Sequence, residues 1–332
     1  MRLGLIGPAV AALLLAACDT QTVSQATPSP TSASPSASAA ASPTPSPQPL
    51  QRPEPSLPVP IEETAAASAG GKLYVMGGFN AAGTSLSTVY VFDGTRWTSG
   101  PRLPLPLDHP SAATLNDHVY IAGGHTNGAD SARLFRLDGS RWTTLASMHF
   151  ARGGHALVAV AARLYAIGGN TRSGNVGPAE EYNPAANSWT VLTSLPQPRN
   201  HVAGFALAGA ACAAGGRSPT TAHVDCFNVA SRTWNRLPNL PAASSGAGAA
   251  VLGADIVVAG GEDASETRIF DQFAYYSTGS GWSAAGTMLS PRHGFELAVF
   301  EGRAWACGGG SAPGLHPVAT CTSLGDRATS KP

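Results

Sequence analysis

The chain has 332 residues, and its 20 Lys and Arg balance its 20 Asp and Glu, so the formal net charge is zero. This balance argues against nucleic acid as a partner, because binding a phosphate backbone favours a basic surplus on one face. The 38 Gly and 27 Pro argue against long helical bundles, since both residues destabilise helix interiors.

Residues 1–17 have the features of a secretory signal peptide. Arg2 precedes an uncharged apolar run, residues 3–15, that is too short to span a bilayer stably. The run ends in Leu15-Ala16-Ala17-Cys18, which resembles a bacterial lipobox, in which the cysteine is lipidated and becomes the mature N-terminus. The resemblance implies an exported protein that a diacylglycerol group on Cys18 anchors to the membrane, facing outside the cytoplasm. The alternative is an ordinary signal peptide followed by an unmodified cysteine.

The next segment, residues 18–49, consists almost entirely of Ser, Thr, Ala, Pro and Gln. Its central stretch, TPSPTSASPSASAAASPTPSPQP, has no charge and no large apolar side chain. Such a composition cannot bury enough surface to offset the entropy lost on folding. We therefore expect a disordered tether that its prolines stiffen.

The remainder of the chain repeats. Six short, mostly apolar segments each end in a Gly-Gly pair, at spacings of 45 to 48 residues, and a tryptophan follows five of these pairs after 19 to 22 residues. A period of this length with four short strands in each unit is typical of the blades of a β-propeller. The first glycines are Gly77, Gly123, Gly168, Gly215, Gly260 and Gly308. The tryptophans are Trp97, Trp142, Trp189, Trp234 and Trp282.

The double glycine, a tyrosine three residues before it and the later tryptophan resemble the kelch repeat; the tyrosines are Tyr74, Tyr120 and Tyr165. The resemblance covers residues 50–325 and implies an all-β, six-bladed kelch-type β-propeller. The sixth unit has no tryptophan strand, and the segment 57–60, LPVP, matches the segment 103–106, LPLP. We therefore expect the N-terminal strand just before residue 57 to close the last blade, leaving residues 326–332 as a C-terminal tail.

Four cysteines lie within the predicted propeller, in two pairs of equal spacing. In each pair the first cysteine falls on the second strand of a blade and the other on the third strand. Neighbouring antiparallel strands bring such positions within reach of a disulfide, and export supplies an oxidising compartment. We predict the disulfides Cys212–Cys226 and Cys307–Cys321, with buried free thiols as the alternative.

Polar side chains concentrate in the loops that should open on one face of the propeller. Arg152, Arg199 and Arg292 share one position in their units, so we expect three guanidinium groups around one mouth. A guanidinium binds carboxylate or phosphate through paired hydrogen bonds, which favours an anionic ligand. The alternative is that each arginine bonds carbonyl groups at a blade junction. Further candidate ligand contacts in these loops are His155, His201 and Arg217.

No metal or cofactor is expected, because the nine histidines show no HExxH or similar tight spacing, and we find neither a GxSxG nor a Walker motif. The pattern favours a non-catalytic binding module for a protein, peptide or glycan. The alternative is a sugar-processing enzyme, because exported kelch proteins of bacteria include an epimerase of the sialic acid type. A glutamate would then act as acid or base on an acidic sugar, and the candidates are Glu62, Glu63, Glu262 and Glu296. A purely structural role is the third possibility.

Overall fold

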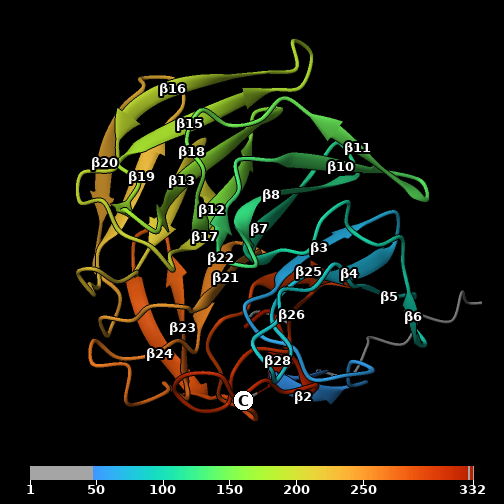
Figure 1. The fold of residues 1–332 in the computed structure, drawn as a ribbon. Helices are drawn as coiled ribbons and strands as arrows, with labels where there is room; N and C mark the ends of the chain where they lie inside the picture. Colours follow the sequence, from blue (N-terminus) through green and yellow to red (C-terminus); the bar gives the residue numbers. More distant parts are fainter. Residues whose placement is uncertain (1–47, 328–329, 332) are drawn as a thin grey trace, which may run out of the picture. The chain divides into compact units, whose positions relative to one another are not determined.

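The computed structural model describes residues 48–327 and 330–331, and every regular element in that part of the chain is a β-strand. The predicted signal peptide, the lipidation site Cys18 and nearly all of the predicted tether lie outside the described residues. Within the described part, no helix has the length and hydropathy needed to cross a bilayer. Six antiparallel sheets surround a common centre, which confirms the expected six-bladed propeller (Figure 1).

The blades follow one another along the chain, and each runs outward from its innermost strand. The first blade contains β3 (Ala65–Ala69), β4 (Lys72–Met76), β5 (Val89–Phe92) and β6 (Trp97–Ser99). The second contains β7 (Asp108–Leu115), β8 (His118–Thr126), β10 (Leu134–Asp138) and β11 (Arg141–Leu145), with the short β9 (Ala129–Asp130) beside β8. The third contains β12 (Gly153–Val160), β13 (Arg163–Thr171), β15 (Pro178–Asn183) and β16 (Ser188–Ser194), with β14 (Gly174–Asn175) beside β13.

The remaining three blades have the same plan. The fourth contains β17 (Ala203–Leu207), β18 (Ala210–Ala214), β19 (Val224–Asn228) and β20 (Thr233–Leu237). The fifth contains β21 (Gly248–Leu252), β22 (Asp255–Ala259), β23 (Gln272–Ser277) and β24 (Gly281–Thr287). The sixth contains β25 (Leu297–Phe300), β26 (Arg303–Cys307), β27 (Cys321–Leu324) and, from the other end of the chain, β2 (Gln51–Glu54). Each innermost strand contacts the innermost strands of both neighbouring blades, so the ring closes between β25 and β3.

The N-terminal strand closes the last blade, as the sequence predicts. β2 pairs antiparallel with β27, from Gln51 opposite Leu324 to Glu54 opposite Cys321. The predicted C-terminal tail is also held in place, because β1 (Gln48–Pro49) pairs with β28 (Ser330–Lys331). Arg327 adds an ion pair with Asp255 at 2.7 Å. Both ends of the folded part are therefore tied to the propeller.

The repeated double glycine joins each blade to the next one. The amide of the second glycine donates to a backbone carbonyl at the start of the following blade, for example Gly124 to Arg152 at 2.8 Å. A Cβ at the first glycine, such as Gly123, would collide with that same carbonyl oxygen. The sixth pair repeats the bond across the closure, from Gly309 to Ile61 at 2.9 Å. This close approach explains why the six pairs recur at the blade period.

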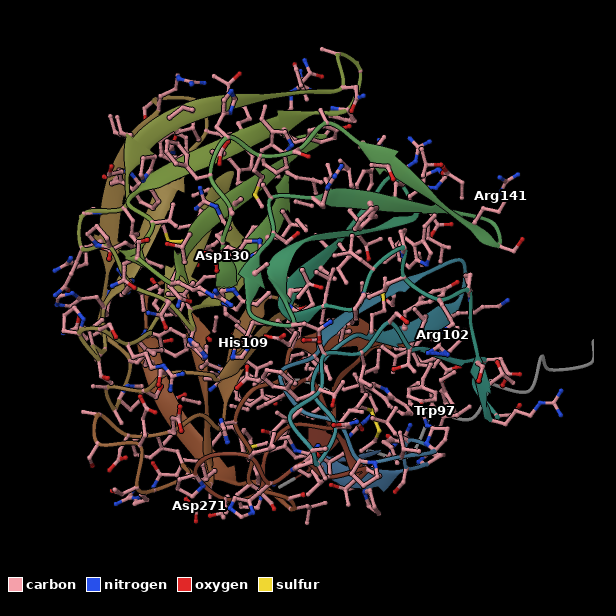
Figure 2. The ribbon with its side chains drawn as sticks, in the orientation of Figure 1. Trp97, Arg102, His109, Asp130, Arg141 and Asp271 are labelled. Atoms are coloured by element: carbon pink, nitrogen blue, oxygen red, sulfur yellow. A yellow bond between two sulfur atoms is a disulfide. The ribbon has the colours of Figure 1, made fainter. Side chains whose placement is uncertain are left out.

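The repeated tryptophans form a second set of links near the outer edge of the ring. The indole nitrogen of Trp142 donates to the carbonyl of Pro101 in the preceding blade at 2.8 Å, and Trp97 donates to Pro55 at 2.7 Å across the closure. Figure 2 shows Trp97 at the outer side of the ring and His109 near its centre. Within the described residues, six hydrophobic clusters fill the spaces between neighbouring blades. Each blade thus covers the apolar faces of its neighbours.

The two predicted disulfides are present. Cys212 on β18 lies directly opposite Cys226 on β19, and Cys307 on β26 lies opposite Cys321 on β27. Both pairs are bonded. Each bond therefore links the two middle strands within one blade.

Candidate functional site

The three arginines expected at the mouth are fully buried inside their blades, so that expectation is corrected. Arg152, Arg199 and Arg292 each have 0% of their surface exposed. Each guanidinium donates to the carbonyl of the first glycine in its own blade: Gly168 at 2.8 Å, Gly215 at 2.5 Å and Gly308 at 2.7 Å. These bonds to carbonyl groups match the alternative considered from the sequence. We assign the arginines to the stability of the blade junctions and not to ligand contact.

Two of these arginines carry an internal counter-charge. Arg152 forms an ion pair with the fully buried Glu180 at 3.0 Å, and Arg199 forms one with Asp225 at 2.9 Å. Among residues 48–327, the hydrogen bonds of Arg292 go to neutral oxygens, including the carbonyl of Thr320 at 2.7 Å. Burial without a carboxylate lowers the pKa of Arg292 to about 10. Glu180 and Asp225 occupy equivalent positions on the third strands of their blades, whereas the neutral Thr322 occupies that position in the sixth blade.

A ring of six residues lies where the chain enters the innermost strands, and all six have left-handed backbone conformation. Their φ angles lie between 52° and 65°. They are Glu63, His109, Gly154, His201, Gly246 and Gly294, one from each blade in chain order. Glycine adopts this conformation freely, whereas other residues pay about 1–2 kcal/mol. Three blades use glycine here, and three keep a glutamate or histidine despite that cost.

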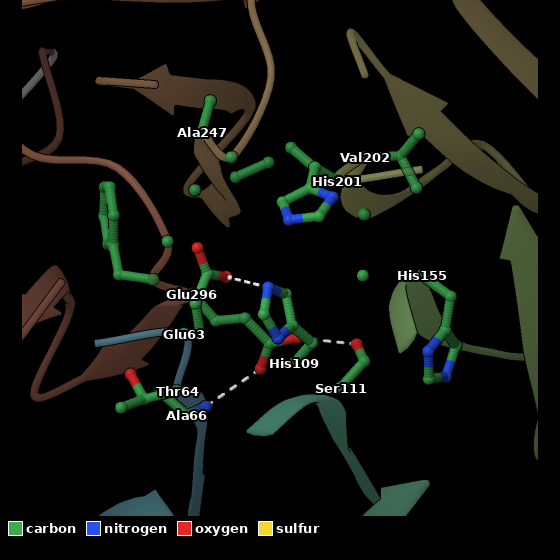
Figure 3. Close-up of a pocket in the computed structure, with 18 of the residues that line it drawn as sticks. Glu63, Thr64, Ala66, His109, Ser111, His155, His201, Val202, Ala247 and Glu296 are labelled. Carbon is green, nitrogen blue, oxygen red and sulfur yellow. Dashed lines mark hydrogen bonds and ion pairs between the residues drawn. The ribbon is translucent and has the colours of Figure 1, made fainter. Parts of the chain in front are cut away.

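The ring is held together by its own backbone. Five of its amides donate to the carbonyl of a ring neighbour at distances between 2.6 and 3.1 Å, for example Glu63 to Gly294 and Gly246 to His201. The glycines make room for the three side chains. A Cβ at Gly294 would collide with the Glu63 carboxylate, and one at Gly154 would come within 2.9 Å of the His201 ring. Figure 3 shows the side chains of Glu63, His109 and His201 converging at the centre.

The two ring histidines are oriented by neighbouring side chains. Nδ1 of His109 lies 2.7 Å from the Asp108 carboxylate, and its Nε2 lies 3.4 Å from Glu63. Burial opposes the charged form of His109, but Glu63 and Asp108 outweigh that effect and raise its pKa. Nδ1 of His201 lies 2.5 Å from Oδ1 of Asn200. Burial, reinforced by Arg217, holds the pKa of His201 well below its usual value.

Two depressions open at the loop face beside this ring, and His109, Phe79 and Gly83 line both of them. The first, of about 270 Å³, is also lined by Glu62, Glu63, Arg217, Glu262, Glu266 and His293. The second, of about 360 Å³, is also lined by Asp108, His125, Asn170 and Arg172. We call the two depressions together the mouth. Four glutamates against one arginine make the first depression acidic.

Arg217, a predicted ligand contact, lies in the mouth but is already paired. Its guanidinium lies 2.6 Å from Glu262 and 3.0 Å from Glu266. Its Nη2 also donates to Nε2 of His201 at 2.9 Å. Burial raises the pKa of Glu62 to about 7 and raises that of Glu262 as well. Burial thus opposes the charged form of both carboxyl groups.

Comparison with known proteins identifies the type of repeat in this chain. The family model of the Kelch motif matches residues 63–104, 106–149 and 151–196, which span the first three blades. This chain is a kelch-repeat β-propeller. The solved structure of YjhT resembles this kelch propeller over 83% of this chain and 98% of its own, with a TM-score of 0.71 and 15% sequence identity, a likeness that shows the fold alone. A search of curated proteins found no match.

Below the ring, the kelch propeller encloses a narrow channel of about 90 Å³. His155, another predicted ligand contact, lines this channel and is 4% exposed, and within the described part of the chain neither ring nitrogen has a hydrogen-bond partner. Burial holds the pKa of His155 well below its usual value. His155 therefore lies within the channel wall as a neutral ring, and not on the open mouth.

Glu296 also lies in the channel and ties three blades together. Its carboxylate accepts hydrogen bonds from the Ala66 amide at 2.8 Å, the Ser111 hydroxyl at 2.5 Å and the Ala112 amide at 3.2 Å (Figure 3). Burial raises the pKa of Glu296 from 4.5 to about 7, although these hydrogen bonds oppose the shift. The folded protein therefore binds this proton more tightly than the unfolded chain does.

We expect this carboxyl group to make the kelch propeller less stable as the pH rises. Between about pH 4.5 and pH 7 the folded state holds the extra proton, so the free energy of unfolding should fall across that range by at most about 3 kcal/mol. Urea unfolding at pH 5 and pH 8 measures the difference. Glu296→Gln should reduce it, whereas Glu301→Gln at the exposed surface should leave it unchanged. An identical pH dependence in all three proteins would contradict this role of Glu296.

The ring residues Glu63, His109 and His201 were not recognised as one group from the sequence. The signal was present in the repeat register, because each occupies the position that is glycine in the third, fifth and sixth blades. A non-glycine residue at a repeat position that other blades fill with glycine therefore marks a candidate site residue.

Proposed function

We propose that this kelch propeller is a binding module, tethered outside the cytoplasm, that holds a hydroxyl-rich glycan at its mouth. The observation that carries the proposal is the pair of adjoining depressions that share Phe79 and His109. The phenyl ring of Phe79 and the imidazole ring of His109 meet edge to face, with centroids 5.5 Å apart. An aromatic ring beside several charged groups is the combination that orients a ligand with one apolar face and many hydroxyl groups.

The charge of the mouth bears on the class of glycan. Arg152 and Arg199 are neutralised by internal carboxylates, and Arg292 is buried among carbonyls, so none of them offers a free guanidinium. The acidic side chains Glu62, Glu262 and Glu266 accept hydrogen bonds from hydroxyl or amino groups. These features favour a neutral or amino sugar over the anionic ligand expected from the sequence.

Calorimetric titration with neutral, amino and acidic oligosaccharides tests the proposal. The wild type should bind a neutral or amino sugar, and Phe79→Ala should weaken that binding at least about tenfold, as for the loss of one well-packed aromatic contact. Phe150→Ala removes a partly exposed phenylalanine that lines neither depression and serves as the matched control. The absence of binding to every sugar, or equal losses in both variants, would overturn the glycan proposal.

The same samples separate a binding module from the enzyme considered in the sequence analysis. Each sugar is incubated with the protein and examined by NMR for a new anomer or epimer. A sugar that is bound and recovered unchanged supports the binding module. Conversion that Glu262→Gln abolishes would instead favour the sugar-processing enzyme.

The location is a separate part of the proposal. We expect Cys18→Ser to release the protein from membranes into the soluble exported fraction, because the lipid that the lipobox resemblance implies on this cysteine would then be missing. Fractionation of cells followed by immunoblotting measures the distribution. A Cys18→Ser variant that stays in the membrane fraction would contradict the lipid anchor.

A further inference from the structure

Three side chains of the ring meet where they line the channel, although they come from the first, second and fourth blades. One ligand atom from each of Glu63, His109 and His201 lies within 4.8 Å of the other two. Oε2 of Glu63 and Nε2 of His109 are 3.4 Å apart. A metal ion about 2.0–2.2 Å from each ligand holds ligand atoms at similar separations. We propose that these residues bind a divalent transition metal ion, an inference that does not rest on the proposed glycan binding.

Neighbouring side chains prepare both histidines for this role. Asp108 accepts a hydrogen bond from Nδ1 of His109 and is itself fixed by the Ser85 hydroxyl at 2.5 Å. The amide nitrogen of Asn200 donates to Asn175 at 2.6 Å, so its oxygen is the atom that accepts from Nδ1 of His201. In both rings Nδ1 donates to a fixed oxygen, so Nε2 is the nitrogen left for a metal. Such partners behind Nδ1 are typical of histidines that ligate metals.

A buried histidine beside the cluster gives an independent indication of a cation. The side chain of His293 is 5% exposed, and its Nε2 lies 3.2 Å from the Ala312 carbonyl, to which it donates. Its Nδ1 has no hydrogen-bond partner among the described residues and lies 3.8 Å from both Glu63 and Glu262. Two carboxylates that face one space repel each other unless a cation or a proton donor lies between them.

The backbone conformation points to the same three residues. Glu63, His109 and His201 are the non-glycine members of the left-handed ring, and glycine would fit each position without strain. Residues held in such conformations cluster at binding and catalytic sites, where the side chain compensates for the cost. The retained side chains are the same three that form the cluster.

When no metal is bound, the guanidinium group of Arg217 supplies the positive charge beside the cluster. Its guanidinium donates to Nε2 of His201, a member of the cluster, and to Glu262. Its side chain is 22% exposed, and it lies 3.0 Å from Glu266, which is 53% exposed. The arginine can therefore turn toward Glu266 while a metal takes its place. Metal and guanidinium compete for the same nitrogen of His201.

The ligand set selects the class of metal. Two imidazole nitrogens and one carboxylate suit Zn²⁺, Co²⁺ or Ni²⁺, whereas Mg²⁺ and Ca²⁺ prefer a shell of oxygen atoms. The site would leave at least one coordination position toward the mouth, as metal sites with three protein ligands do.

Titration of the full folded chain with Zn²⁺, Co²⁺ and Ca²⁺ tests the site. We expect one Zn²⁺ per chain by calorimetry, a visible absorption band from bound Co²⁺, and no Ca²⁺ binding. His109→Gly and His201→Gly should each weaken Zn²⁺ binding about 100-fold or more. Glycine suits the left-handed backbone, so these variants are expected to fold. His118→Ala, at an exposed histidine outside the ring, is the control and should bind Zn²⁺ as the wild type does.

Arg217→Leu gives the sharpest result, because removal of the competing cation should tighten Zn²⁺ binding about tenfold or more. The Co²⁺ spectrum of the wild type provides a test that does not depend on any variant folding. Failure of the wild type to bind Zn²⁺ and Co²⁺ at millimolar concentration would overturn the proposal. Zn²⁺ binding that survives both glycine variants would also overturn it, since the ion would then occupy another place.

Discussion

Replacing Arg152 with alanine is expected to lower the free energy of unfolding by about 3–5 kcal/mol. The substitution leaves the Glu180 carboxylate inside the third blade without its guanidinium partner, and both side chains are fully buried. It also removes the donors to the carbonyls of Gly168 and Pro178. The buried carboxylate then loses the charge that offset much of its desolvation, although His149 and the Phe150 amide still contact it. Urea unfolding followed by intrinsic tryptophan fluorescence measures the loss.

The matched control is Arg163→Ala in the same blade. Arg163 lies 3.6 Å from Glu181 and is about one-third exposed, so its loss should cost less than about 1 kcal/mol. A variant Arg152→Ala that unfolds like the wild type but loses ligand binding would return this arginine to the role of a ligand contact. Measuring both stability and ligand binding of the two variants therefore distinguishes an arginine that binds an anionic ligand from one that stabilises a blade junction.

Deleting the chain up to residue 56 is expected to lower the melting temperature by on the order of 10 °C or to cause aggregation. The deletion removes β2 and exposes the edge of β27 in the sixth blade. It also removes Glu54, which accepts a hydrogen bond from Ser323, and Ser323 in turn accepts one from the buried Arg303. The carbonyl of Pro55 that receives the Trp97 indole is lost as well.

A control deletion of residues 19–45 should melt like the full chain, because their composition predicts a tether without a packed core. Calorimetry and light scattering of the three proteins give the comparison. Equal melting of all three would mean that the N-terminal strand does not close the ring in solution.

The parts of the fold that the sequence predicted depend on a repeated local feature. Gly-Gly recurs because each second glycine donates to the next blade and each first glycine must let a carbonyl approach. The tryptophans recur because each one reaches back to the previous blade. The cysteine pairs were predictable because their equal spacing places them opposite each other on adjacent strands. These constraints act within one repeat or between two consecutive repeats, so they leave a periodic trace.

The candidate site depends on relations that no local pattern contains. The sequence by itself determined that Arg152, Arg199 and Arg292 share one position, but only the tertiary structure decided that their side chains enter the blades, because burial and the carbonyls of Gly168, Gly215 and Gly308 satisfy their donors there. The grouping of Glu63, His109 and His201 arises from closure of the ring, which brings residues of the first, second and fourth blades within 4.8 Å. A repeat period specifies that six equivalent positions face one axis. Which side chains meet there, and which cations neutralise them, follows from three-dimensional packing and electrostatics across the channel.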